Sequence, residues 1–206
     1  MTVQGEHNEL FASTDRGNKN VLQITGSRNK VQIGANCKIN DLNCTMIGDN
    51  LSLILEDGVR IVGRLKIAGS GARIVIGRNT TFERINIVCI EGAKVIIGAE
   101  CMFSFGIEVR TSDAHSIVDL ETRRRINKPG DVIVGDHVWI GSNVTLNKGI
   151  SIASDVIVGT RAVVTKDINE EHCAVAGIPA RIVRRSVSWD RKLVSVGEVA
   201  GPPLVF

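Results

Sequence analysis

The sequence predicts an all-β domain folded as a parallel β-helix, and two periodic series of aliphatic residues carry this prediction. The first series repeats every six residues without a break: Val134, Ile140, Leu146, Ile152, Val158 and Val164. The second places a small aliphatic residue four positions after each member of the first: Val138, Val144, Ile150, Val156, Ala162 and Ile168. Neither an α-helix, with a period of 3.6, nor an alternating strand gives a strict period of six.

The composition agrees with a narrow solenoid. Hydrophobic residues make up 43% of the 206-residue chain, which suffices for one sizeable core, but aromatic residues make up only 3%. Stacked β-branched side chains fill such an interior better than large rings. The 21 Gly and only four Pro suit many tight corners. We expect a β-helix domain over residues 1–168 and a C-terminal extension over residues 169–206.

Five longer phrases show the same repeat along most of the chain. Each pairs an aliphatic residue with Gly and has an apolar residue six positions after that aliphatic. The phrases are KVQIGANCKI from Lys30, RIVIGRNTTF from Arg73, KVIIGAECMF from Lys94, DVIVGDHVWI from Asp131 and DVIVGTRAVV from Asp155. They place the solenoid between roughly residues 20 and 168. At about eighteen residues per coil, this allows on the order of seven coils.

One segment interrupts the repeat. Residues 111–130, TSDAHSIVDLETRRRINKPG, are polar and charged, lack the six-residue period and end in a Pro-Gly turn signal. The repeat resumes directly afterwards. Because insertions in solenoids form loops on one face, often the binding face, we expect a functional inserted loop here.

The two ends of the chain depart from the repeat. Residues 186–196, SVSWDRKLVSV, favour a short helix, and residues 197–206 a loose tail. The N-terminal MTVQGEHNEL lacks the basic and apolar regions of a signal peptide. No apolar run reaches membrane-spanning length.

Charge and cysteine content bound the partners and the compartment. The net charge is only +3, and neither RNP-like aromatics nor zinc-finger spacing is present, so we expect no nucleic acid partner. The cysteines are odd in number and form no C-x-x-C, which favours reduced thiols in a cytoplasmic protein. They are Cys37, Cys44, Cys89, Cys101 and Cys173.

His115 is the candidate catalytic residue of the inserted loop. A histidine on a protruding loop can accept a proton near neutral pH. A nearby carboxylate can fix its tautomer, and Asp113 is one candidate. The alternative interpretation is a solvated histidine without a role.

A basic cluster shares the loop with His115. Arg123, Arg124, Arg125 and Lys128 favour an anionic substrate next to the candidate base. The alternative is a solvated charge run, which is the usual state of such clusters.

The coil repeat also predicts which outward residues are neighbours. Residues eighteen apart should lie about 4.8 Å from each other on adjacent coils, which pairs Ser142 with Thr160 and Lys148 with Lys166. Two stacked lysines repel unless they splay into water or bind an anion between them. The second possibility predicts a cationic edge for a phosphate-rich ligand. Residues that could add to this edge are Arg181, Arg184 and Arg185.

Trp139 directly precedes an inward position of the repeat. Its indole should therefore face outward, either in a subunit interface or as a platform for a ligand.

The segment from His115 to Arg184 resembles the hexapeptide-repeat acyltransferases. The matching pieces are DAHSI, GDVIVGDHVWIGSNV, VIVGTRAVVTKDI and AVAGIPARIVR, within about a third of the chain. This motif set resembles the sugar O-acetyltransferase branch. The separation of His115 and Trp139 is further similar to that in the sialic-acid and polysialic-acid capsule O-acetyltransferases of bacteria.

The resemblance implies a left-handed coil, a homotrimer with active sites in clefts between neighbouring coils, and acetyl-CoA as co-substrate along the coil edge. It implies that His115 is the general base toward a sugar hydroxyl and that Trp139 lies near the thioester. The residues assigned to acetyl-CoA are Asp113, Ser142, Lys148, Thr160, Thr165, Lys166, Arg181 and Arg184. Arg123, Arg124 and Arg125 are assigned to the acceptor, and no metal is expected.

The expected function is transfer of acetyl from acetyl-CoA to a hydroxyl of a bacterial surface glycan, with sialic acid in a capsular polysaccharide as the first candidate. Alternatives are an acetyltransferase of another sugar or of an antibiotic, and a binding solenoid without turnover. A metal-dependent enzyme like carbonic anhydrase would need three convergent histidines, but His115, His137 and His172 lack metal-ligand spacing.

Overall fold

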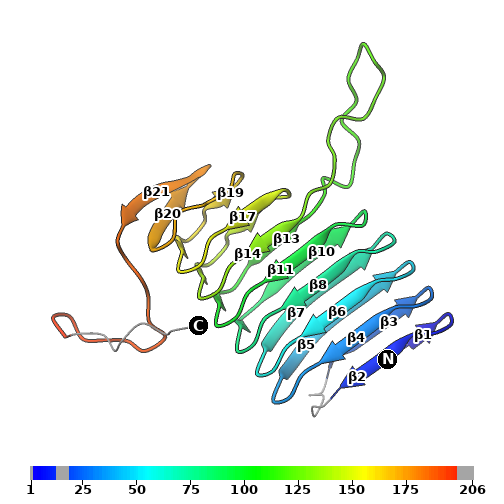
Figure 1. The fold of residues 1–206 in the computed structure, drawn as a ribbon, viewed down its shortest axis with the longest axis horizontal. Coiled ribbons are helices and arrows are strands. Elements are labelled where there is room, and N and C mark those ends of the chain that lie inside the picture. Colours follow the sequence, from blue (N-terminus) through cyan, green and yellow to red (C-terminus); the bar gives the residue numbers. More distant parts are fainter. Residues whose placement is uncertain (1, 13–18, 199–206) are drawn as a thin grey trace.

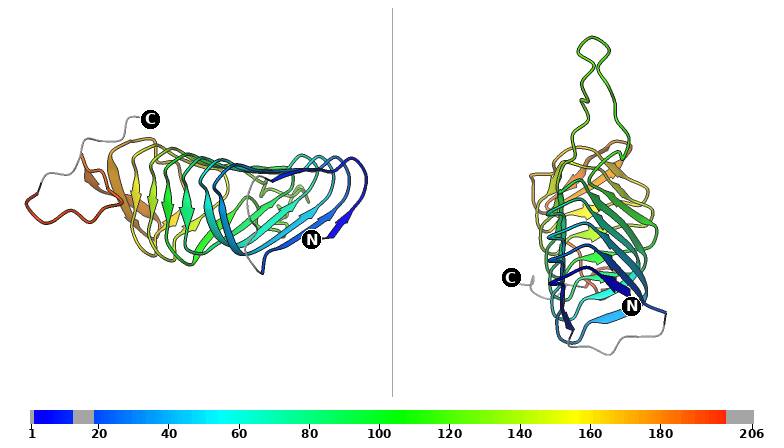
Figure 2. Two further views of the ribbon diagram at one scale, coloured as in Figure 1. Left: turned by 90° about the horizontal axis from the view of Figure 1, so that it is seen from below. Right: turned by 90° about the vertical axis from the view of Figure 1, so that its right-hand side faces the viewer.

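The computed structural model describes residues 2–12 and 19–198, and it confirms a left-handed parallel β-helix (Figure 1). The chain winds through three flat faces, and every strand pairs in parallel with the equivalent strand of the next coil, up to a C-terminal hairpin. Figure 2 looks along the stack in its right-hand view and shows the coils superposed, with one long loop projecting from them.

The first face has eight strands: β1 (Thr2–Gln4), β3 (Val21–Thr25), β5 (Lys38–Ile47), β7 (Arg60–Ala68), β10 (Ile85–Ile90), β13 (Ile107–Arg110), β16 (Thr145–Leu146) and β19 (Val163–Val164). The second face is a seven-stranded sheet: β2 (Glu9–Ala12), β4 (Lys30–Ile33), β6 (Ser52–Leu55), β8 (Arg73–Ile76), β11 (Lys94–Ile97), β14 (Val132–Val134) and β17 (Ile150–Ile152). The third face contains β9 (Thr81–Phe82), β12 (Met102–Phe103), β15 (Trp139–Ile140), β18 (Ile157–Val158) and β20 (Cys173–Gly177). The final strand, β21 (Ala180–Arg185), pairs antiparallel with β20.

The coils are not uniform in length, and the regular downstream coils have the expected eighteen residues. Downstream, Thr145 pairs with Val163, eighteen positions later. Upstream, Val21 pairs with Asn43, 22 positions later. Two of the upstream strands, β5 and β7, of ten and nine residues, continue around a corner and serve two faces each. These longer coils explain why the upstream repeat is irregular, and the solenoid already begins at β1, before residue 20.

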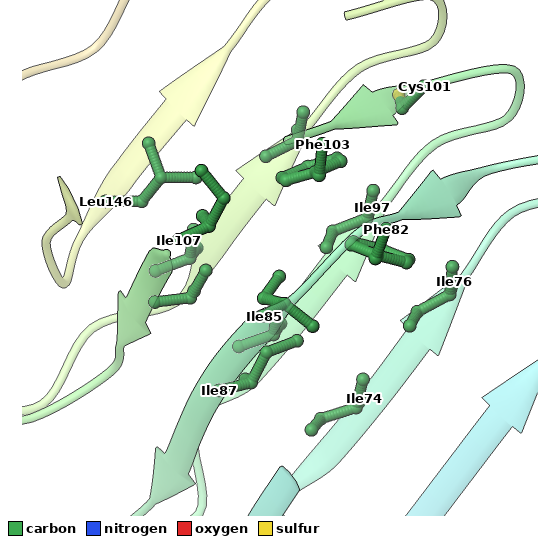
Figure 3. Packing of buried hydrophobic residues seen from close by; sticks show 14 of the residues in the cluster. Ile74, Ile76, Phe82, Ile85, Ile87, Ile97, Cys101, Phe103, Ile107 and Leu146 are labelled. Atoms are coloured by element: carbon green, nitrogen blue, oxygen red, sulfur yellow. The ribbon is translucent and has the colours of Figure 1, made fainter. Parts of the chain in front are cut away.

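The interior is a stack of aliphatic side chains, and both periodic series are part of it (Figure 3). No residue of the six-residue series is more than 2% exposed. In the middle coils, the rings of Phe82 and Phe103 pack against each other, with their centroids 4.7 Å apart. The equivalent positions of the following coils hold Ile140 and Val158.

The repeat glycines lie where adjacent coils approach most closely. A Cβ on Gly77 would lie 2.5 Å from the Ala99 nitrogen, so no side chain fits there. The left-handed backbone falls two positions later, on residues such as Asn79 with φ of 56°. Close packing of the coils, rather than a positive φ, therefore explains the Gly of each phrase.

Residues 111–130, called the arm below, project from the body between β13 and β14 (Figures 1 and 2). An antiparallel bridge between Val118 and Arg125 joins its two sides. The arm thus begins at the corner between the first and second faces, where the expected insertion interrupts the repeat.

The expected short helix over residues 186–196 is wrong, because these residues form no helix. Residues 187–198, called the C-terminal strap below, instead run in an irregular, extended path. Trp189 lies on His137, and Arg191 reaches Thr81 and Cys101 on earlier coils. A compact helix would not let both side chains reach different coils. The expected loose tail lies outside the described residues beyond Glu198. No membrane-crossing helix is found in the part of the chain that the structure describes.

Candidate active site

The arm presents His115 to solvent at the corner between the first and second faces. Ala114, directly before it, has a left-handed φ of 63°, and its N–H donates to Ser112 Oγ at 3.0 Å. This turn directs the chain outward immediately after the buried Thr111 and Ser112. His115 therefore lies close to the body of the solenoid rather than at the distal tip of the arm.

Asp113 joins the arm to the next coil. Its carboxylate pairs with the Lys148 ammonium, and it also accepts a hydrogen bond from Asn127 Nδ2 at 2.7 Å. These contacts, with Lys148 first, hold the pKa of Asp113 below its ordinary value. Among the described residues, the Asp113 carboxylate makes no hydrogen bond with the His115 ring, so it does not fix its tautomer here. The two stacked lysines were expected either to splay into water or to bind an anion, and in the structure Lys148 pairs with the carboxylate of Asp113.

Asn127 lies at the centre of the arm's base and is only 9% exposed. Its Nδ2 donates to Asp113 and to the His115 carbonyl oxygen, both at 2.7 Å. Its Oδ1 accepts from the Ile117 N–H at 2.8 Å and from Arg125 Nε at 3.1 Å. The Asn127 side chain therefore connects the returning part of the arm to the residues before and after His115.

Glu91 anchors the arm from the body. It accepts two hydrogen bonds from the Arg125 guanidinium, at 2.6 and 3.0 Å, and a third from Ser112 Oγ. The Arg125 and Ser112 contacts lower the pKa of Glu91 to about 2. Because this pKa is depressed, the anchor is present above the ordinary pKa of glutamate and is lost only as the pH falls through about 2.

Arg125, which was expected to bind the acceptor, donates from its guanidinium to Glu91 and Asn127 within the same chain. Arg123, Arg124 and Lys128 remain exposed on the arm. Sequence reasoning missed both Glu91 and Asn127. Coil register could have indicated Glu91, because Ser112 lies one coil length of 21 residues after it.

Trp139 lies on the third face, and its indole is 38% exposed, as its place before Ile140 predicts. Trp189 of the C-terminal strap packs beside it, with ring centroids 6.1 Å apart. Trp189 stacks on His137 at 4.4 Å and donates its Nε1–H to the His137 carbonyl oxygen at 2.9 Å. His137 in turn contacts Asp155 at 2.7 Å. The strap was not expected to contact the candidate thioester residue.

Two of the expected acetyl-CoA residues come together in a groove of about 570 Å³ near the C-terminal end of the solenoid. Lys166 enters it from the corner after β19, and Arg181 from β21. Thr165 precedes Lys166 and is exposed, as is Arg184 on β21. The groove thus combines these two cations with two acidic residues, Asp167 and Glu170, and with apolar wall residues such as Val175.

Ser142 and Thr160 lie at a different corner, between the third and first faces. Ser142 Oγ is 3.0 Å from Ser104 Oγ of the preceding coil. The Arg161 N–H bonds to the Ser142 carbonyl, which confirms that the Ser142 and Thr160 turns are adjacent. Within one chain, these two residues do not share the groove of Lys166 and Arg181.

His115 and Trp139 are also separated within one chain. The arm leaves the corner between β13 and β14, whereas β15 is on the third face, which does not meet that corner. The two side chains thus lie at different sides of the coil within one chain. Over residues 2–12 and 19–198, no three His, Cys, Asp or Glu side chains gather as metal ligands.

A comparison with protein-family models finds no match. A polysialic acid O-acetyltransferase of Neisseria meningitidis is 39% identical over 191 residues, which are 92% of this chain and 89% of that protein. A polysialic acid O-acetyltransferase of Escherichia coli O1:K1 / APEC is 36% identical over 125 residues, which are 61% of this chain and 40% of that protein.

Two solved structures also superpose on the chain. The polySia specific acetyltransferase NeuO superposes with a TM-score of 0.85 and 31% identity, over 93% of this chain and 88% of that one. The polysialic acid O-acetyltransferase OatWY superposes with a TM-score of 0.82 and 37% identity, over 95% of this chain and 93% of that one. The similarity therefore extends over almost the entire chain.

Proposed function

The chain belongs to the polysialic acid O-acetyltransferases, which are hexapeptide-repeat enzymes, and from this membership we propose that it transfers acetyl from acetyl-CoA to a hydroxyl of sialic acid in a bacterial capsular polysaccharide. The observation that carries the proposal is the 39% identity over 92% of the chain. The exposed cations of the arm, Arg123 and Arg124, support an anionic acceptor.

The proposed reaction is a direct transfer in a ternary complex. His115 accepts the proton of the acceptor hydroxyl while that oxygen attacks the thioester carbonyl. The C–S bond then breaks, and the thiolate of CoA leaves as the new ester forms. Cysteine is not part of the arm, which supports direct transfer over an acyl-enzyme.

We propose that the active unit is a homotrimer. The separation of His115 and Trp139 on one chain supports this, because a neighbouring copy can supply the second residue. The arm also exposes Ile117, Leu120 and Ile126, of which Leu120 is 83% exposed. Apolar side chains on a projecting arm suit a contact with another copy. In this arrangement Trp139 of one copy lies near the thioester that His115 of another copy serves.

The groove with Lys166 and Arg181 is proposed to hold the phosphates of acetyl-CoA. Thr165, Ser142, Thr160 and Arg184 supply further contacts from the coil corners of adjoining copies. Lys148 and Asp113 are proposed to act on the arm instead, since they pair with each other.

Replacing Lys166 with alanine is expected to raise the KM for acetyl-CoA by on the order of tenfold at low salt, because a hydrogen bond to a charged group stabilises by about 1.5 kcal/mol or more. The effect should shrink with added salt, which screens charge–phosphate attraction. Steady-state kinetics with acetyl-CoA varied would measure it. Lys38→Ala, an exposed lysine of β5, is the control. An unchanged KM at low salt would remove Lys166 from the site.

The acceptor is tested by comparing polysialic acid with a neutral glycan of similar length. Turnover should favour the anionic polymer, and the preference should decrease as salt rises. The variant Arg123→Gln/Arg124→Gln should reduce the preference, since arginine suits bidentate binding of carboxylates. Arg28→Gln is a matched control, because Arg28 is exposed and has a left-handed φ of 57°, like Arg123 at 55°. Equal turnover of the neutral glycan would instead favour another sugar as acceptor.

A cytoplasmic location is proposed from the cysteines. All five are unpaired and buried. Burial raises the pKa of Cys44 and of Cys101 to about 12, so these thiols act as small apolar residues of the core. Unpaired thiols throughout suit a reducing compartment.

A further inference from the structure

We infer that Asn127 is a positioning residue that fixes the backbone of His115 for proton transfer. This inference rests on the proposed function, since it assumes that His115 is the base. It assigns a role to a side chain that neither contacts the acceptor nor carries charge. Asn127 makes four hydrogen bonds, all to other residues at the base of the arm.

The surroundings of Asn127 match the hydrogen-bonding groups of an asparagine side chain. The amide group supplies two N–H donors and one oxygen with two lone pairs. All are used: the donors by Asp113 and the His115 carbonyl, the oxygen by the Ile117 N–H and Arg125 Nε. Aspartate would lack the donors, and a buried polar group that loses its partners is costly.

The contacts of Asn127 lie on both sides of His115 along the chain. Asn127 bonds the carbonyl of His115 itself and the N–H of Ile117, two residues later. It also bonds the Asp113 side chain, two residues earlier. His115 is therefore held from both sides by a group on the opposite side of the arm.

Asn127 is also connected to the body of the solenoid. Asp113 pairs with Lys148 of the next coil, and Arg125 pairs with Glu91 of the preceding coil. Asn127 bonds both Asp113 and Arg125, so it joins two ion pairs that flank the arm. A projecting arm would otherwise move relative to the coils, and a misplacement of about 1 Å at a reacting group can cost about 10²-fold in rate.

Two variants separate the functions of the amide. Asn127→Ala removes all four hydrogen bonds. Asn127→Asp keeps the oxygen that accepts from Ile117 and Arg125, but it loses both donors and adds a carboxylate beside Asp113. Asn43→Ala, an exposed asparagine of β5, is the matched control and should behave as wild type.

The kinetic experiment is a double-mutant cycle with His115→Ala, using polysialic acid and acetyl-CoA. Asn127→Ala and Asn127→Asp should each lower kcat by about 10- to 100-fold with the KM for acetyl-CoA unchanged. In the His115→Ala background, neither should lower kcat further, because residues that act as a unit are non-additive. Wild-type kcat in Asn127→Ala, an equal loss in both backgrounds, or a change confined to KM would each overturn the inference.

Amide hydrogen exchange tests the same inference without turnover. The Ile117 N–H should exchange faster in Asn127→Ala but stay protected in Asn127→Asp, which keeps its acceptor. Unchanged exchange of the Ile117 N–H in Asn127→Ala would overturn the inference even if kcat were lowered in that variant. The variant His115→Ala distinguishes failure of the proposed function. Wild-type turnover in that variant would show that His115 is not the general base, whereas the exchange data would still report whether Asn127 holds the arm.

Discussion

Replacing His115 with alanine is expected to reduce kcat by about 10²- to 10⁴-fold, the usual contribution of a positioned general base. The acceptor hydroxyl would then lose its proton acceptor at the moment of attack on the thioester. The side chain is exposed and extends from the arm, so its removal should leave the fold and the binding of acetyl-CoA unchanged. Steady-state kinetics and a direct acetyl-CoA binding measurement would separate the two effects.

The control for His115 is His172→Asn, because His172 is also exposed but lies near the C-terminal hairpin. Asparagine tolerates the left-handed φ of 52° at that position. This variant should retain wild-type kcat. A near wild-type kcat for His115→Ala would end its assignment as the base.

Replacing Phe103 with alanine is expected to lower the free energy of unfolding by about 3–5 kcal/mol, the range for a fully buried phenylalanine. Phe103 is 0% exposed, packs on Phe82, and its strand β12 pairs with β15, which carries Trp139. The residual cavity would therefore lie one strand away from the candidate thioester residue. Equilibrium urea denaturation at a fixed protein concentration would measure the loss.

Phe105→Ala is the matched control, since Phe105 lies two residues later on the same coil and is 52% exposed. Its loss should remain within about 0.5 kcal/mol, as for most surface substitutions. Equal losses for the two variants would mean that the inward register of the coils is not what the structure describes.

The sequence predicted the solenoid because its period is physical: every sixth residue of the regular coils is inward, and inward residues must be apolar. The same logic placed the arm, since only an unpatterned segment can leave the stack. It did not predict the 21- and 22-residue lengths of the upstream coils. It also did not predict that β5 and β7 turn a corner without a break in the strand, because no turn signal marks that corner. It predicted a helix at residues 186–196 because local propensity does not report a tertiary contact such as that between Trp189 and His137.

For the candidate site, residue type and motif indicated His115 and Trp139, but pairing partners were harder to predict. Arg125 and Lys148 read as free cations in the sequence, because their counter-ions Glu91 and Asp113 lie 34 and 35 residues away. Asn127 was missed since a single amide in a charged loop has no distinctive pattern. Its role depends on the path of the arm, which only the three-dimensional structure describes.

The C-terminal strap has a consequence for how the molecule opens. In a solenoid each coil contacts only its neighbours, so the terminal coils fray independently of the middle. Here Arg191 donates to the carbonyls of Asn79, Glu100 and Cys101, while Trp189 covers His137. The C-terminal strap is thus hydrogen-bonded to coils well inside the stack. Opening of the C-terminal coils then requires release of the strap, which makes them and the middle coils one cooperative unit.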